Sequence, residues 1–105
     1  MSTYLIISVK EIRGKCPIFK GGERIVIRDA EIDLKNTDKL CIHALTSILH
    51  YAVALREGVN PIKLGLTKKG KKAYIQCLNP GKPYTKGGTV IFEIIRKQRI
   101  QGREI

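Results

Sequence analysis

The sequence predicts an α+β fold in which a largely antiparallel sheet of four or five strands packs against one amphipathic helix. Three observations lead to this class: several runs alternate apolar and polar residues, one longer run has helical spacing, and no βαβ unit repeats. One helix cannot cover both faces of a parallel sheet, so antiparallel pairing is favoured. Whether the sheet closes into a barrel-like form is left open. The 105 residues suffice for a single domain, 1–105.

The first half of the chain predicts a hairpin and a short edge strand. Residues 4–12 alternate between apolar and polar side chains, which is typical of a half-buried strand. Gly14 ends this run, and a loop rich in glycine leads to a second apolar run at residues 24–28. Residues 30–34 alternate weakly and predict a third strand at the edge of the sheet.

Residues 39–57 predict the helix. Asp38 is the expected N-cap and Gly58 the expected end. His43 and His50 lie on a polar stripe, about 10.5 Å apart along the axis, so they cannot share a metal and are expected at the surface. The apolar positions recur every three or four residues: Cys41, Leu45, Ile48, Ala52 and Leu55.

Two further strands are predicted in the second half of the chain, at residues 73–78 and 89–97, with a loop rich in proline and glycine between them. In the last strand, Ile91 and Ile95 lie on the face opposite Phe92. A sheet that is apolar on both faces needs a packing partner on each, and the single predicted helix can bury only one face. We therefore expect the protein to form a homo-oligomer.

The chain is expected to be cytoplasmic and not to enter a membrane. Its longest apolar-rich stretch, residues 41–55, is interrupted by polar residues and falls short of the ~20 residues of a membrane span. The N-terminus lacks a positive region, and Ser8 and Lys10 interrupt the apolar run that follows. An odd number of widely spaced cysteines fits reduced thiols better than disulfides.

The three cysteines, Cys16, Cys41 and Cys77, form the first candidate site. Cys16 lies in a loop, and Cys41 is expected in the first helical turn, where free N–H groups and the macrodipole would stabilise a thiolate. A thiol-based site, with a metal ion or redox chemistry, is one hypothesis. The alternative is core packing, since free cysteine is among the most buried residue types. No pair has CxxC spacing, and no other cofactor is predicted.

Charge defines the second candidate site. The chain carries 20 Lys and Arg against 9 Asp and Glu, a net charge of +11. Lysines among exposed aromatic rings are typical of surfaces that bind single-stranded nucleic acid or another polyanion, and the alternative is a solvated basic face. The candidate residues, which have no acid among them, are Lys63, Lys68, Lys69, Lys71, Lys72, Tyr74, Lys82, Tyr84 and Lys86.

An enzyme is the less favoured class. The chain has no G-x-S-x-G motif and no clear pair of carboxylates in an apolar setting. Residues 65–71 match the glycine and lysine spacing of a P-loop, but Lys72 stands where a Ser or Thr should bind the metal. The segment also runs into a predicted strand instead of opening a helix, so it predicts a basic turn.

The chain resembles an uncharacterised family of small archaeal and bacterial proteins with three recurring cysteines. The residues that carry the resemblance are Cys16-Pro17, Lys20, Gly22-Glu23, Leu40-Cys41, Ala44, Leu55, Gly58, Cys77, Pro80, Val90, Phe92, Ile94 and Arg96. Glu23 stands where the family has Asp, Ile42 where it often has Pro, and Asn79 where it has Asp. The resemblance covers most of the chain, draws attention to the cysteines and implies no activity.

The sequence thus leaves three functional hypotheses. The leading one is a small cytoplasmic binding module with the thiol-based site. A basic domain that binds nucleic acid or another polyanion is the second hypothesis. The third is a structural domain that associates with copies of itself.

Overall fold

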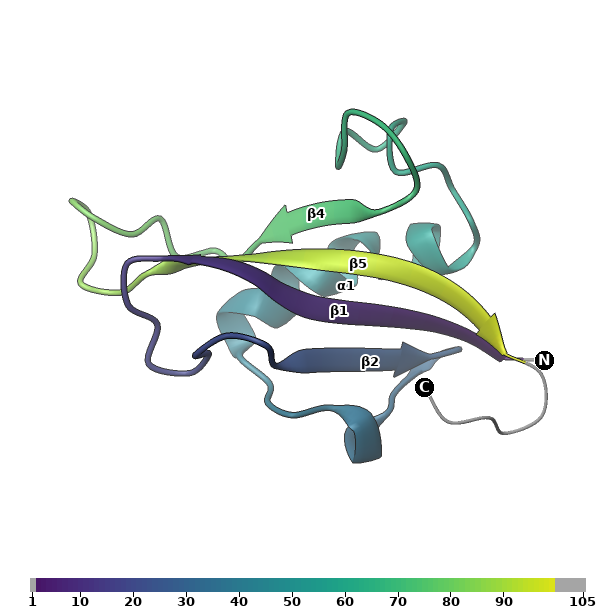
Figure 1. Ribbon diagram of the computed structural model, residues 1–105, viewed down its shortest axis with the longest axis horizontal. Coiled ribbons are helices and arrows are strands. Elements are labelled where there is room, and N and C mark those ends of the chain that lie inside the picture. The colour runs from purple at the N-terminus through teal and green to yellow at the C-terminus, as the bar shows by residue number, and fades with distance from the viewer. Residues whose placement is uncertain (1, 100–105) are drawn as a thin grey trace.

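The computed structural model describes residues 2–99 of the chain. Helix α1 (Ile42–Arg56) lies behind a twisted sheet, and a short 3₁₀ turn, η1 (Leu34–Asn36), lies beside β2 (Figure 1). The α+β class and the antiparallel sheet are confirmed. The strands, in the order β3-β2-β1-β5-β4 across the sheet, are β1 (Ser2–Arg13), β2 (Arg24–Arg28), β3 (Glu31–Ile32), β4 (Ala73–Gln76) and β5 (Thr89–Arg99).

The sheet is open, so the barrel-like closure left possible by the sequence does not form. β3 and β4 are its two edges, and no other strand of residues 2–99 joins them. The long strands β1 and β5 pair along their whole length at the centre of the sheet. With only two residues in β3 and four in β4, the edges are too short to meet around a barrel.

A register shift in β1 keeps its apolar side chains on the helix side of the sheet. Val9 pairs with Phe92 and Glu11 with Ile91, so Lys10 is an extra residue in β1. Without this bulge, Ile12 would face away from α1, because side chains alternate strictly along a strand. With it, Ile12 packs against the core.

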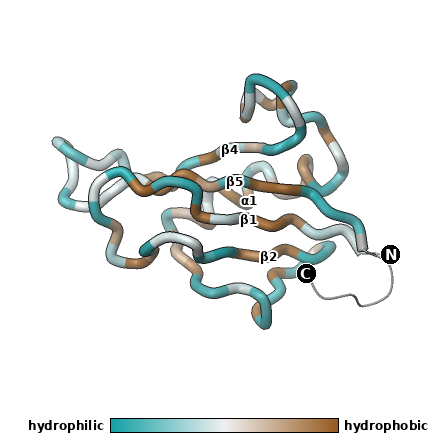
Figure 2. The backbone as a smooth tube through the Cα atoms, in the orientation of Figure 1, coloured by the Kyte–Doolittle hydropathy of each residue, from teal (hydrophilic) through white to brown (hydrophobic). Residues whose placement is uncertain are grey.

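The main core lies between the sheet and α1. The helix contributes Ala44, Ile48, Ala52 and Leu55, whose spacing of four, four and three residues places them along one face. The sheet contributes alternate residues, and the hydrophobic stretches of the backbone lie in the middle of β1, β2 and β5 (Figure 2). The predicted apolar faces of β4 and β5 are confirmed: Ala73, Ile75, Cys77, Val90, Phe92 and Ile94 are all buried.

The helix begins later than predicted, because Asp38 is engaged elsewhere. Its side chain accepts the N–H of Arg24 at 3.0 Å, and its own N–H donates to the Arg24 carbonyl at 2.9 Å. This pair holds the residue beside β2. Cys41 is the N-cap instead, and α1 starts at Ile42. The prediction that Cys41 lies inside the first helical turn was therefore wrong.

The opposite face of the sheet carries a smaller apolar cluster. Tyr4, Ile6 and Val26 are buried there, and Ile91 and Ile95 are half-buried. Apolar side chains thus occupy both faces of the sheet, as the sequence predicts. Self-association stays a prediction. No helix within residues 2–99 has the length and apolar character that crossing a lipid bilayer requires.

Two aspartates beside β2 and β3 are expected to make stability depend on pH. Asp29, at a φ of 53°, accepts the N–H of Thr3 at 2.9 Å, and this hydrogen bond lowers the pKa of Asp29. The side-chain amide of Asn36 donates to Asp33 at 2.8 Å, which lowers the pKa of Asp33. A pKa lower in the folded than in the unfolded chain stabilises the fold above the unfolded value, near 4.

That stabilisation is lost as the pH falls through 4 toward the lowered folded values. We expect the urea concentration at which half of the protein is unfolded to be lower at pH 3 than at pH 5. In the double variant Asp29→Asn with Asp33→Asn, the fall is smaller, because asparagine still accepts these hydrogen bonds but does not titrate in this range. Equal falls in the two proteins would contradict the assignment.

Candidate functional site

All three cysteines pack against the main core, each with different contacts. Cys77 is buried, and its Sγ accepts the N–H of Val90 at 3.3 Å. Cys16 is half-buried, and its Sγ accepts the N–H of Phe19 at 3.4 Å. Cys41 is half-buried at the start of α1, where its side chain makes no capping hydrogen bond to a described residue.

Cys16 and Cys77 thus contribute to core packing and accept backbone hydrogen bonds. Within residues 2–99, no group of three or more His, Cys, Asp and Glu side chains is arranged to hold a metal ion. The thiol-based site therefore stays a prediction. His43 and His50 are both exposed, as expected.

The predicted basic residues are divided between two loops. One loop precedes β4, and the other joins β4 to β5; Figure 1 shows them extending from opposite ends of β4. The two predicted tyrosines are separated in the same way. Near the first loop are Lys63, Lys68, Lys69, Lys71, Lys72 and Tyr74, and in the second are Lys82, Tyr84 and Lys86. The structure does not gather all nine residues on one patch.

The first loop concentrates the positive charge. Residues 67–72, here called the lysine loop, place four exposed lysines within five positions. A shallow hollow of about 670 Å³ is lined by this loop together with Tyr74. Like charges held this close repel one another, and an anion bound in the hollow would relieve that repulsion.

Tyr74 links the lysine loop to the sheet. Its side chain lines the hollow from β4, and its hydroxyl donates to the Glu93 carboxylate at 3.0 Å. This hydrogen bond raises the pKa of Tyr74, so the hydroxyl stays protonated at neutral pH. Lys10 lies 3.7 Å from the same carboxylate. The phenol is therefore held at its tip, and its ring remains partly exposed.

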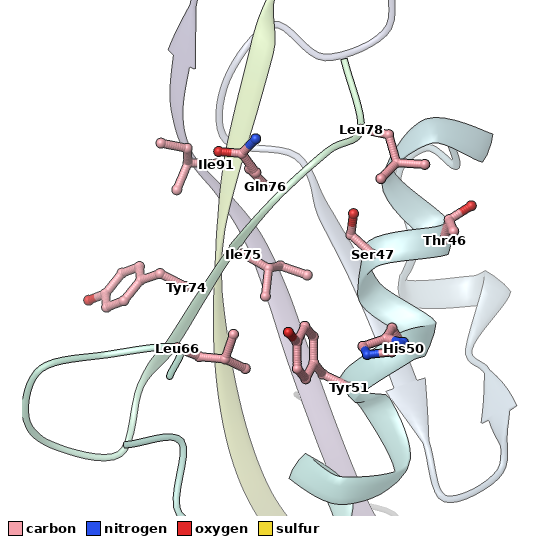
Figure 3. Close-up of a pocket in the computed structure, with 10 residues that line it drawn as sticks. All are labelled: Thr46, Ser47, His50, Tyr51, Leu66, Tyr74, Ile75, Gln76, Leu78 and Ile91. Carbon is pink, nitrogen blue, oxygen red and sulfur yellow. The ribbon is translucent and has the colours of Figure 1, made fainter. Parts of the chain in front are cut away.

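A second cavity, here called the α1–β4 groove, adjoins the lysine loop. Its volume is about 580 Å³, within the usual range for ligand pockets. In Figure 3, Ile75 points from β4 toward α1, and Tyr74 points away from the helix. The groove thus follows the free edge of β4. Its lining residues are Thr46, Ser47, His50, Tyr51, Leu66, Tyr74, Ile75, Gln76, Leu78 and Ile91.

Apolar walls and a few polar groups give the groove its chemical character. Tyr51 from α1 and Leu66 from the loop before β4 line the groove on two sides, and Leu78 lies at one end (Figure 3). Ser47 and His50 add a hydroxyl and an imidazole from the helix. Apolar walls with sparse polar groups are typical of sites that hold a small organic molecule. Because Tyr74 lines both cavities, the groove and the cationic hollow adjoin at this side chain.

Sequence reasoning did not find the groove. The helical residues Ser47 and His50 stand out only as part of a polar stripe, and Gln76 only as an outward position of a strand. They meet because β4 pairs with β5 at the edge of the sheet and α1 packs beside it. The signal that the sequence does contain is the lysine loop next to Tyr74.

Comparison of the chain with protein-family models, with curated proteins and with solved structures finds no match. The resemblance to the three-cysteine family therefore stays a prediction. The lysine loop and the α1–β4 groove are the features of the structure that bear on function.

Proposed function

We propose that the protein is a small binding module for single-stranded nucleic acid, which it holds through the lysine loop and the α1–β4 groove. The observation that carries this proposal is that a cationic hollow and an apolar groove adjoin at Tyr74, which lines both. Single-stranded nucleic acid needs both surfaces, because its phosphates seek positive charge and its bases seek apolar or aromatic contact.

The charge of the molecule supports an anionic partner. The net charge is +11, and residues 58–92 contain seven lysines and no acid. A field of this kind raises the rate at which anions approach the surface. The acidic residues gather elsewhere: residues 29–39 hold four acids and two lysines, a local charge of −2. An anion is therefore directed toward the lysine loop.

The groove favours a single strand over a duplex. The bases of a duplex are stacked and paired, so their faces are closed to a protein groove, whereas a single strand can turn a base outward. Sequence preference is expected to be slight, since stacking and phosphate contacts are sequence-tolerant. A rigid sulfated polysaccharide offers charge but no base, which makes heparin the matched comparison.

The proposal is tested by titrating a labelled, mixed-sequence single-stranded oligonucleotide at several salt concentrations and reading fluorescence anisotropy. Affinity should fall with a log–log slope of about −0.7 per phosphate contacted, so four lysine contacts give about −2.8. Duplex of the same sequence and heparin should bind more weakly. Equal affinity for heparin would show that the charge attracts any polyanion, and no binding near 0.15 M salt would exclude nucleic acid as the partner; either result would overturn the proposal.

A further inference from the structure

The geometry points to a nucleobase pocket: we infer that the α1–β4 groove holds one unstacked base of the bound strand, whose edge pairs with the outward-facing backbone N–H and C=O of Gln76. This inference rests on the proposed function and adds to it the group that fills the groove. Three features support it: the hydrogen-bonding pattern of β4, the composition of the groove walls and the position of the lysine loop.

The backbone N–H and C=O of Gln76 point away from β5, toward the free edge of the sheet. Cys77 continues the pairing of β4 with β5, and its N–H donates to the Val90 carbonyl at 3.0 Å. In an antiparallel pair the residues alternate between bonding the partner strand and facing outward. Gln76 is therefore an outward residue. Within residues 2–99, its N–H and its C=O bond no other backbone group, and the residue lines the groove.

The neighbouring outward N–H groups are already bonded. The N–H of Tyr74 donates to the Leu66 carbonyl at 2.9 Å, and the N–H of Leu78 donates to the His43 carbonyl at 3.1 Å. These two carbonyls occupy the positions that an added β-strand would need on either side of Gln76. The free edge is thus one residue long. It suits a compact planar group better than an extended peptide.

A nucleobase matches this isolated pair of groups. Its Watson–Crick edge presents a donor and an acceptor side by side, and proteins read unstacked bases on that edge. The backbone C=O and N–H of Gln76 supply the complementary acceptor and donor. Tyr51, Leu66 and Leu78 would then contact the faces of the ring, where stacking and apolar contact favour any base.

The lysine loop is placed to bind the phosphates of the same strand. It meets the groove at Tyr74, which lines both cavities. A nucleotide whose base enters the groove therefore has its phosphates directed toward the exposed Lys68, Lys69, Lys71 and Lys72. Affinity then has two separable parts, a salt-dependent part from the phosphates and a base-dependent part from the groove.

The test compares a single-stranded oligonucleotide with an abasic strand of the same length and charge. Gln76→Pro removes the outward N–H without breaking a bond to β5, and proline is tolerated on edge strands. Gln76→Ala removes the side chain but keeps the N–H, and serves as its control. The wild-type protein should bind the base-containing strand about tenfold more tightly than the abasic strand. Gln76→Pro should lose most of this preference, and Gln76→Ala should retain it.

A second pair of variants covers the case in which Gln76→Pro fails to fold. Leu78→Gln removes an apolar wall of the groove, and Leu34→Gln makes the same change at another exposed leucine, 69% exposed and outside the groove. The inference requires the base preference to fall in Leu78→Gln and to persist in Leu34→Gln.

The outcomes separate this inference from the proposed function. Equal binding of base-containing and abasic strands, with the expected salt slope, would overturn the base pocket and leave the proposed function standing. Absence of binding to either strand would overturn both. Tighter binding of an acidic peptide that alternates Glu and Val, abolished in Gln76→Pro, would show that the edge takes a strand and overturn the base pocket.

Discussion

Replacing Lys68, Lys69, Lys71 and Lys72 together with glutamine is expected to weaken binding of a single-stranded oligonucleotide by about 4-fold to 900-fold at low salt. Each exposed lysine that binds a phosphate contributes about 0.2–1 kcal/mol, so four contribute about 0.8–4 kcal/mol. The slope of log affinity against log salt should flatten by about 0.7 for each phosphate that is no longer bound. Anisotropy titrations at four salt concentrations measure both quantities.

The matched control removes the same charge elsewhere. Glutamine at Lys15, Lys20, Lys35 and Lys97, all exposed and outside both cavities, also lowers the net charge from +11 to +7. If binding is local to the lysine loop, this variant keeps nearly the wild-type slope. Equal losses of affinity in the two variants would mean that net charge alone attracts the nucleic acid, and the lysine loop would not be a site.

The fold could be predicted from the sequence wherever local pattern and burial agree. The alternation of apolar residues in β1, β4 and β5 reflects one face packed on α1, so period and burial carry the same information. The start of α1 could not be predicted in this way. Asn36, Thr37 and Asp38 all favour an N-cap, but the Arg24 backbone binds Asp38, and that interaction exists only once β2 is in place.

The candidate site shows the same division between local and distant information. Charge is local in sequence, so the lysine loop is visible there as four lysines next to Tyr74. Grouping Tyr84 with them was an assumption of proximity, and β4 separates the two loops instead (Figure 1). The α1–β4 groove depends on strand order. Sequence alone does not say that β4 is an edge or that His50 and Gln76 line one cavity.

The two cavities also differ in what supports them. The α1–β4 groove is built on a helix and a strand that both contribute buried side chains to the core, so its walls are held by packing. None of residues 67–72 of the lysine loop packs in the core; Leu66, the residue before the loop, packs partly against the core, and the Thr67 hydroxyl donates to the Lys69 carbonyl at 3.0 Å. A groove held by packing, beside a solvent-exposed cationic loop, suits a ligand with one planar group on an anionic backbone.

Phe92→Ala is expected to lower the free energy of unfolding by about 3–5 kcal/mol, the largest effect on stability that we expect from any of these variants. Phe92 is 1% exposed in β5, and alanine there leaves a cavity that the surrounding strands and α1 cannot fill. Its ring also meets the ring of Phe19 edge to face, with centroids 5.4 Å apart, and alanine removes this aromatic pair as well.

Loss of the Phe92 ring should also disturb the α1–β4 groove, because Phe92 in β5 pairs with Ile75 in β4, which lines the groove. A reduction of this size is a large part of the 5–15 kcal/mol that stabilises a typical domain. Urea denaturation at pH 7 measures it, and Tyr84→Ala is the aromatic control, since Tyr84 is 82% exposed and should change stability by less than about 0.5 kcal/mol. Similar midpoints for the two variants would show that Phe92, with its contact to Phe19 of the β1–β2 loop, does not stabilise the core as its burial predicts.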